Sequence, residues 1–180
     1  GRNDARANPN QLMLAPRNAA GIGELATLLR RSHAEKFGAR SADALLLGLQ
    51  LTHSGRFSKH RPDFVPDPLV AYAHPWLDRR FPGGVHILTD DELDRLCEDF
   101  ITAARLAWDL GFHFVDLKHC HGYLGHELLS ARDRPGRYGG SLDNRLRFLR
   151  TIVDGIRATV PGLQIGVRLS AFDTPPHVPG

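Results

Sequence analysis

The sequence predicts an α/β domain built on a parallel sheet. Segments with helical and strand-like periodicity alternate three times along the 180 residues, and each helix precedes a strand. The strand segments are short and mostly apolar, which is typical of strands that are buried on both faces. Repeated alternation of this kind favours parallel strands joined by helices over an antiparallel sheet.

The first helix and strand are expected in the N-terminal third of the chain. Residues 44–51 form an apolar run of strand length, and residues 52–88 are rich in Pro, Gly and His without any period, so we expect a long loop there. The helix is expected over residues 22–37. Its apolar face carries Leu25, Leu28 and Leu29.

A capping box marks the start of the second helix. The Thr89 side chain can accept a hydrogen bond from the amide of Glu92, and the Glu92 carboxylate can accept one from the amide of Thr89. Gly111 suits the end of this helix, and residues 112–118 form the next strand. The helix has an apolar stripe made by Leu93, Leu96, Phe100, Ala104 and Ala107.

A third helix and strand are expected in the C-terminal part. Ser141 is expected to cap the helix, and residues 163–169 form the strand. Residues 171–180 contain little core-forming material, so we expect an irregular tail. The apolar positions of the helix are Leu146, Leu149, Val153 and Ile156.

Each predicted strand ends with a polar residue on one face. Because side chains alternate across a strand, Gln50, Lys118 and Arg168 would meet at the carboxyl ends of the strands, where α/β barrels carry their chemistry. A structural alternative is that Asp116 pairs with Lys118 or Arg168 inside the sheet.

Proton-handling side chains are dense directly after the second strand. This density favours either an acid–base site or a zinc site, in which His119 and His121 would need a third ligand. Alternation places His119 on the face opposite Lys118, so we expect it to point away from the site. The group comprises Lys118, His119, His121, Tyr123 and His126, and the other possible zinc ligands are His53 and His60.

The composition excludes several classes of protein. The net charge is +3 and the basic residues are spread along the chain, so no nucleic-acid partner is expected. No apolar run reaches the about 18 residues of a membrane span, and we expect a cytoplasmic protein without a membrane partner. Cys97 and Cys120 cannot form a disulfide framework, and Cys120 is expected to be a small buried residue.

Four motifs resemble the Old Yellow Enzyme family of FMN-dependent NAD(P)H:flavin oxidoreductases, which are (β/α)8 barrels. The resemblance extends over residues 44–170 and implies a partial (β/α)8 TIM barrel with about three parallel strands, the third to the fifth, and their helices. Residues 1–180 would then form a single incomplete barrel domain, because a closed barrel typically needs about 250 residues. The motifs are Gln50-Leu-Thr-His-Ser-Gly-Arg56, His121-Gly-Tyr-Leu-Gly-His-Glu-Leu-Leu-Ser130, Tyr138-Gly-Gly-Ser-Leu-Asp-Asn-Arg-Leu-Arg-Phe148 and Gly166-Val-Arg-Leu-Ser170.

The resemblance also implies roles for individual residues. Gln50 and Arg168 would bind the pyrimidine end of FMN, with NAD(P)H as the reductant. His121 would donate to the carbonyl oxygen of a small unsaturated substrate, and Tyr123 would supply the proton. Lys118 stands where the family usually has a His, and it could donate to a carbonyl or to a flavin oxygen.

Other interpretations remain open on the sequence alone. The chain could be a non-catalytic fragment of such an enzyme, whose partner is the missing part of the barrel or a second copy of the chain. A zinc-dependent barrel hydrolase is a further alternative, although no metal site is assigned. The Tyr138 motif, including Asn144 and Arg147, is expected to cap the helix and pack the loop rather than to act in catalysis.

Overall fold

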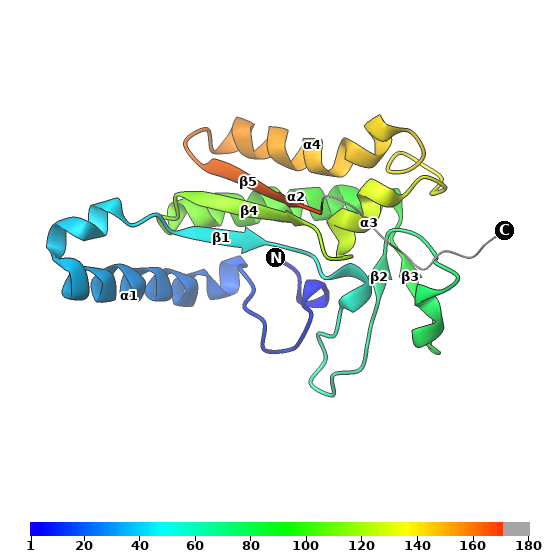
Figure 1. Ribbon diagram of the computed structural model, residues 1–180, viewed down its shortest axis with the longest axis horizontal. Coiled ribbons are helices and arrows are strands. Elements are labelled where there is room, and N and C mark those ends of the chain that lie inside the picture. Colours follow the sequence, from blue (N-terminus) through cyan, green and yellow to red (C-terminus); the bar gives the residue numbers. More distant parts are fainter. Residues whose placement is uncertain (171–180) are drawn as a thin grey trace.

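The computed structural model describes residues 1–170, so the tail expected at 171–180 lies outside the described residues. Three parallel strands form the central sheet in the order β1-β4-β5, as Figure 1 shows. They are β1 (Gly48–Leu51), β4 (Phe114–His119) and β5 (Gln164–Leu169). Neighbours in this sheet are also consecutive among its strands along the chain, which is the order that a β/α barrel requires.

The main helices are α1 (Ala19–Phe37), α2 (Asp90–Asp109), α3 (Leu124–Ser130) and α4 (Leu142–Thr159). Helix α2 packs against α4, β1 and β4, and the apolar core lies between these elements. The short elements are the strands β2 (Leu69–Val70) and β3 (His86–Ile87) and the 3-10 turns Asn3–Ala5, Pro16–Asn18, Ala39–Ala44, Gly55–Phe57 and Leu77–Arg80.

The two faces of the sheet differ in burial. Val115 and Leu117 of β4 are fully buried in the core shared with α2 and α4. On the other face Asp116 and Lys118 are only half-buried, and the face is lined by polar side chains. Helices on one face only, with an open polar face, fit part of a barrel and not a doubly wound sheet. The predicted partial barrel is therefore confirmed, and its three strands do not close.

Helix α2 begins as the sequence predicts. The amide of Glu92 donates to Thr89 Oγ1 at 3.2 Å, and the amide of Thr89 donates to Glu92 Oε2 at 2.7 Å. All five predicted stripe residues of this helix are buried. The α2 prediction is therefore confirmed from its cap to its core face.

Helix α1 has its predicted position but a different buried face. Ile22 and Ala26 are buried, whereas Leu25, Leu28 and Leu29 are 42%, 46% and 47% exposed. Figure 1 shows the reason, because α1 runs outward from the sheet and only its beginning lies near the core. The predicted helix is therefore confirmed, and the face that carries its three leucines is exposed among the described residues.

Other boundaries also differ from the predictions. The strand expected over residues 44–51 begins only at Gly48, where pairing with Phe114 starts, and residues 39–44 form a 3-10 turn. Residues 52–88 include β2, β3 and two 3-10 turns. Helix α3 was not predicted, because seven residues are too few to show a helical period. In α4 the fully buried positions are Phe148, Ile152 and Ile156.

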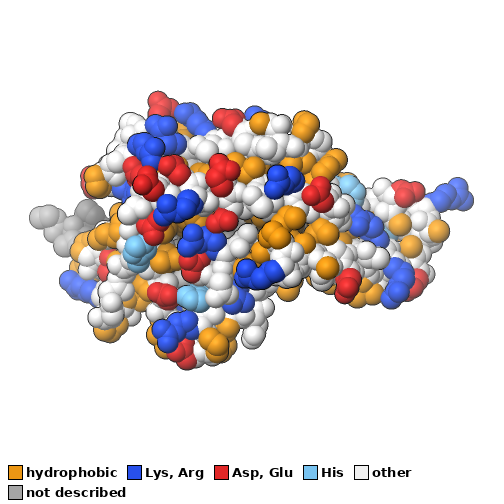
Figure 2. All heavy atoms as spheres, turned by 180° about the vertical axis from the view of Figure 1, so that it is seen from behind, with side chains coloured by type: hydrophobic (Ala, Val, Ile, Leu, Met, Phe, Trp, Pro, Cys, Tyr) orange, Lys and Arg blue, Asp and Glu red, His pale blue; other side chains and the backbone are white. Residues whose placement is uncertain are grey.

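The outer surface of the helices carries mixed charge. Figure 2 shows acidic and basic side chains interspersed on the face behind the view of Figure 1. One ion pair links α2 to the loop that precedes α4, and in it Arg137 Nη2 lies 2.6 Å from Asp94. Exposed pairs of this kind contribute about 0–1 kcal/mol each. No helix in residues 1–170 combines the length and apolar character needed to cross a bilayer.

Two buried histidines make the fold sensitive to acid. Desolvation lowers the pKa of His53 and of His119 to about 4, from 6.5 in an unfolded chain. As the pH falls, the unfolded chain takes up protons first, so folded-state stability is lost progressively between pH 6.5 and about 4.

We predict that protonation linked to each histidine lowers the free energy of unfolding by up to about 3 kcal/mol as the pH falls over this range. Urea unfolding followed at neutral and at acidic pH measures this loss. His119→Leu should make the pH dependence shallower, while the control His33→Leu, in the outer part of α1, should leave it unchanged. Identical pH dependence in wild type and His119→Leu would show that His119 is not the titrating group.

Candidate active site

Four polar residues from three adjacent strands meet on the open face of the sheet, and we call them the strand-end cluster: Gln50, Asp116, Lys118 and Arg168. The register places Gln50 beside Asp116 and Lys118 beside Arg168. Gln50 Nε2 donates to Asp116 Oδ2 at 2.8 Å, and Arg168 Nη2 lies 2.9 Å from the same oxygen. One carboxylate therefore links all three strands at their carboxyl ends.

The structural alternative for Asp116 is thus partly realised. Asp116 pairs with Arg168, as that alternative allowed, and not with Lys118. The bonds to Asp116 use only some of the N–H groups of Gln50 and Arg168, because a guanidinium has five N–H groups and a carboxamide has two. Gln50 and Arg168 keep N–H groups for a ligand while Asp116 holds their side chains in place.

Lys118 contacts an aromatic ring instead of a carboxylate. Its Nζ lies 3.3 Å from the ring centroid of Tyr123, close enough for a strong cation–π contact. Desolvation lowers the pKa of Lys118, and Arg168 acts in the same direction, whereas Cys120 and Asp116 act in the opposite direction without cancelling the shift. The structure therefore brings Lys118 and Tyr123 together, as the sequence-based site requires.

Tyr123 is positioned by the segment that follows β1. Its ring packs against Phe57 with 5.6 Å between ring centroids, and Gly122 also lies against Phe57. Tyr123 directly precedes helix α3, and the amide of Leu124 donates to the carbonyl oxygen of His53 at 3.2 Å. Phe57 thus restricts the ring, and the bond from Leu124 fixes the backbone next to it.

His121 lies in the loop above the strand end. Its φ of 60° places it in the left-handed region, which a residue with a Cβ adopts only at some cost in energy. Its amide donates to Ser170 Oγ at 3.3 Å, which ties this loop to the residue after β5. The His121 side chain is exposed, and within residues 1–170 it makes no hydrogen bond to the strand-end cluster.

A buried ion-pair network anchors α3 through Glu127. The sequence analysis did not predict this network. Arg56 is 1% exposed, its Nε donates to Glu127 Oε1 at 2.5 Å, and its other nitrogens bond Asp78 and the carbonyl oxygen of Tyr72. Glu127 Oε2 in turn accepts from the amide of Ala71 at 3.0 Å. A signal was present, since Arg56 and Glu127 both lie in the motifs quoted above.

His119 and Cys120 do not belong to the site. His119 is 1% exposed, points away from Lys118 and packs against Phe148, as predicted. Cys120 is a buried free thiol, which agrees with its expected role as a small buried residue. Within residues 1–170 no three His, Cys, Asp or Glu side chains are grouped as metal ligands, so the zinc alternative finds no support there.

The Tyr138 motif holds the loop before α4. Tyr138 is buried and its hydroxyl donates to Asp94, while desolvation and this hydrogen bond raise the pKa of the phenol. Asn144 Nδ2 donates to the carbonyl oxygen of Gly139 at 3.0 Å, and Arg147 Nε donates to that of Arg137 at 2.8 Å. These contacts confirm the predicted structural role.

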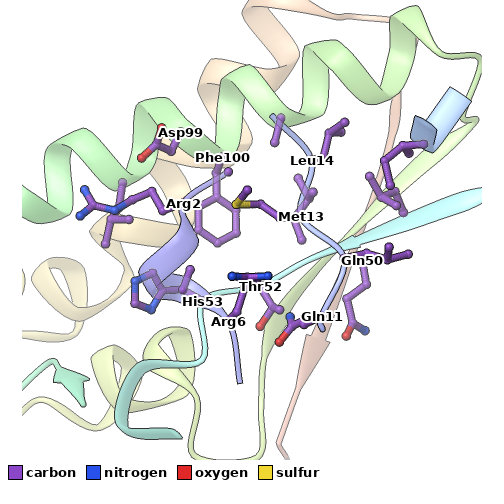
Figure 3. Close-up of a pocket in the computed structure, with 18 residues that line it drawn as sticks. Arg2, Arg6, Gln11, Met13, Leu14, Gln50, Thr52, His53, Asp99 and Phe100 are labelled. Carbon is purple, nitrogen blue, oxygen red and sulfur yellow. The ribbon is translucent and has the colours of Figure 1, made fainter. Parts of the chain in front are cut away.

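A cavity of about 120 Å³ lies on the unpaired edge of β1. Figure 3 shows it between the N-terminal segment, β1 and α2, with Gln50 at one end and Phe100 in its wall. The orphaned Thr52 Oγ1 and His53 Nε2 belong to residues that line it, and neither atom has a hydrogen-bond partner among the described residues. The cavity thus adjoins the strand-end cluster without enclosing Lys118 or Tyr123.

The donors of the strand-end cluster fit the pyrimidine edge of a flavin. That edge alternates carbonyl oxygens with an N–H group, so it needs both donors and an acceptor. The Gln50 carboxamide supplies both, whereas Arg168 and Lys118 supply donors alone. The cationic groups also suit the end of the ring where negative charge develops on reduction.

Comparisons with known proteins agree on one family. Residues 40–176 match the profile of the NADH:flavin oxidoreductase / NADH oxidase family. A putative 12-oxophytodienoate reductase 2 of Oryza sativa subsp. japonica is 42% identical over 146 residues, which cover 71% of this chain and 36% of the relative. An NADPH dehydrogenase of Geobacillus sp. (strain WCH70) is 31% identical over 159 residues, which cover 87% of this chain and 42% of the relative.

Solved structures show the same fold. A histamine dehydrogenase from Rhizobium sp. 4-9 superposes with a TM-score of 0.66 at 25% identity, covering 87% of this chain and 23% of the other. A morphinone reductase mutant in complex with tetrahydroNAD gives 0.70 at 24% identity, covering 93% of this chain and 48% of the other. The chain therefore spans less than half the length of these relatives and structures.

Replacing Arg56 tests whether its buried ion pairs stabilise the part of the fold that carries Tyr123. Arg56→Met leaves the Glu127 and Asp78 carboxylates without their shared cation in a buried place. We predict a loss of about 3–5 kcal/mol in unfolding free energy. Chemical denaturation measures this loss.

Arg61→Met is the matched control, because the Arg61–Asp63 pair is 56% and 48% exposed. It should change stability by about 0–1 kcal/mol. Equal effects of the two substitutions would contradict the structural role of the buried network.

Proposed function

The chain belongs to the NADH:flavin oxidoreductase / NADH oxidase family, and we propose that it forms the central part of an FMN-dependent oxidoreductase barrel. The observation that carries this proposal is the strand-end cluster. Three strands of the family's barrel order deliver a carboxamide, an ammonium and a guanidinium to one open face. That donor set suits a heterocycle whose edge carries hydrogen-bond acceptors better than it suits a metal or a phosphate alone.

When bound, FMN supplies hydride transfer from NAD(P)H to a small unsaturated carbonyl substrate. Gln50 would hydrogen-bond the pyrimidine edge, and Arg168 would hold its positive charge at the same end of the ring. Asp116 acts through these two residues, because its hydrogen bonds fix their side chains before the ligand arrives. Preorganised donors of this kind stabilise developing charge without reorganising.

The substrate is oriented from the other side of the site. His121 donates to the substrate's carbonyl oxygen, which polarises the conjugated alkene, and Lys118 supplies a further donor for another oxygen of the substrate. Tyr123 delivers its hydroxyl proton to the alkene carbon that does not receive the hydride. The packing of Tyr123 on Phe57 and under Lys118 supports this role, since both contacts restrict the ring.

The proposal extends to the organisation of the domain. Residues 1–180 form one incomplete barrel domain, with residues 52–88 as a long connection at the carboxyl ends of the strands. The unpaired edges of β1 and β5 are then covered by further barrel strands or by a second copy of the chain. A non-catalytic fragment is the alternative, and the experiments below separate the two.

Tyr123→Phe tests the proton donor in the intact protein. The half-reaction with NAD(P)H should keep its rate, because the hydroxyl has no role in it. The half-reaction with the unsaturated substrate should slow by about 10²–10⁴-fold. Stopped-flow absorbance of the flavin resolves the two phases, and unchanged rates in both would remove Tyr123 from the mechanism.

Arg168→Ala tests the cofactor site. Loss of the guanidinium removes donors and leaves Asp116 without its cationic partner beside the ligand, so the dissociation constant for FMN should rise by about 10–100-fold. Fluorescence titration of the apoprotein measures this change. Arg157→Ala, at an exposed position in the last turn of α4, is the control. Equal affinity in the two variants would contradict the assignment of Arg168.

A further inference from the structure

Charge at the strand-end cluster is unbalanced. Two cations, Lys118 and Arg168, face one carboxylate, and that carboxylate is already engaged by Arg168 and Gln50. No carboxylate of residues 1–170 lies within 4.0 Å of Lys118 Nζ, which instead contacts the Tyr123 ring. A half-buried ammonium without an anionic partner costs free energy that an arriving anion would offset.

We propose that Lys118 selects substrates which carry a carboxylate next to the reacting alkene. The geometry points to this class because Lys118 lies directly over Tyr123, so an anion on Lys118 is held beside the proton donor. A single uncompensated charge suits a monoanionic carboxylate better than a dianionic phosphate. The inference rests on the proposed function and adds to it the class of substrate.

The environment of Lys118 supports this assignment. Desolvation and Arg168 disfavour the charged form of its amine and outweigh the opposite effects of Cys120 and Asp116, so its pKa is lowered and an arriving negative group favours the charged form. An ammonium is a compact charge with three rotatable donors and can meet a carboxylate at varied angles. The planar imidazole that resembling enzymes carry here suits a neutral carbonyl oxygen instead.

The test uses one pair of ligands, acetylacrylate and its methyl ester, with the intact protein. Both are activated alkenes of nearly the same shape, and only the first carries a carboxylate. Without NAD(P)H neither turns over, so calorimetry gives two dissociation constants and their ratio. The wild type should bind the carboxylate about 10–100-fold more tightly than the ester.

Variants of Lys118 assign this preference to one side chain. Lys118→Met, which keeps the length without the charge, should bring the ratio close to one by weakening the carboxylate alone. Lys118→Arg should retain most of the preference, because it restores the charge. Lys36→Met is the matched control, since Lys36 also lies over an aromatic ring, that of Phe37, in the last turn of α1, the end of that helix that points away from the sheet.

The outcomes distinguish a failure of the carboxylate assignment from a failure of the proposed FMN-dependent function. A wild-type ratio near one, or a ratio that Lys118→Met leaves unchanged, overturns the carboxylate assignment even if FMN is bound and reduced normally. If Lys118→Met weakens both ligands equally, Lys118 is a positioning residue for Tyr123 and the assignment is again overturned. A protein that binds no FMN refutes the proposed function, and calorimetry still measures the ratio.

Discussion

The parallel register of β1, β4 and β5 is the constraint on which the site depends. It places Gln50 opposite Asp116 and Lys118 opposite Arg168, so that all four side chains emerge on one face. A slip of one residue in β4 would turn Asp116 and Lys118 into the core and bring Leu117 to the open face. The buried residues Val115 and Leu117 therefore fix the chemistry as much as they fix the fold.

Asp116 converts this register into a defined arrangement of donors. Long side chains such as Gln and Arg lose rotamer freedom when they bind a ligand, and prior hydrogen bonds to Asp116 reduce that loss. On the side of Tyr123 the Arg56–Glu127 pair has the same effect for α3, because it anchors the helix that follows Tyr123. Both halves of the site are thus held by carboxylates that need not touch the reacting groups.

Much of this arrangement could be predicted from the sequence. Strand alternation alone separates Lys118 from His119, and the structure buries His119 beside Phe148. The capping box at Thr89 fixes the start of α2 because it depends only on local contacts. The sequence does not decide features that depend on distant partners. The periodicity of α1 predicts a helix but not the burial of its leucines, since a periodic face is buried only if another element covers it. The same reason applies to Arg56, whose partners lie 22 and 71 residues away.

The central claim is that the strand-end cluster is an FMN site. Its most direct test is the visible absorption spectrum of the purified intact protein, followed by identification of any flavin released on denaturation. The structure and the family membership lead us to expect one FMN per chain with the absorption bands of oxidised flavin, bleached when NAD(P)H is added. A colourless protein that also fails to bind added FMN would contradict the account.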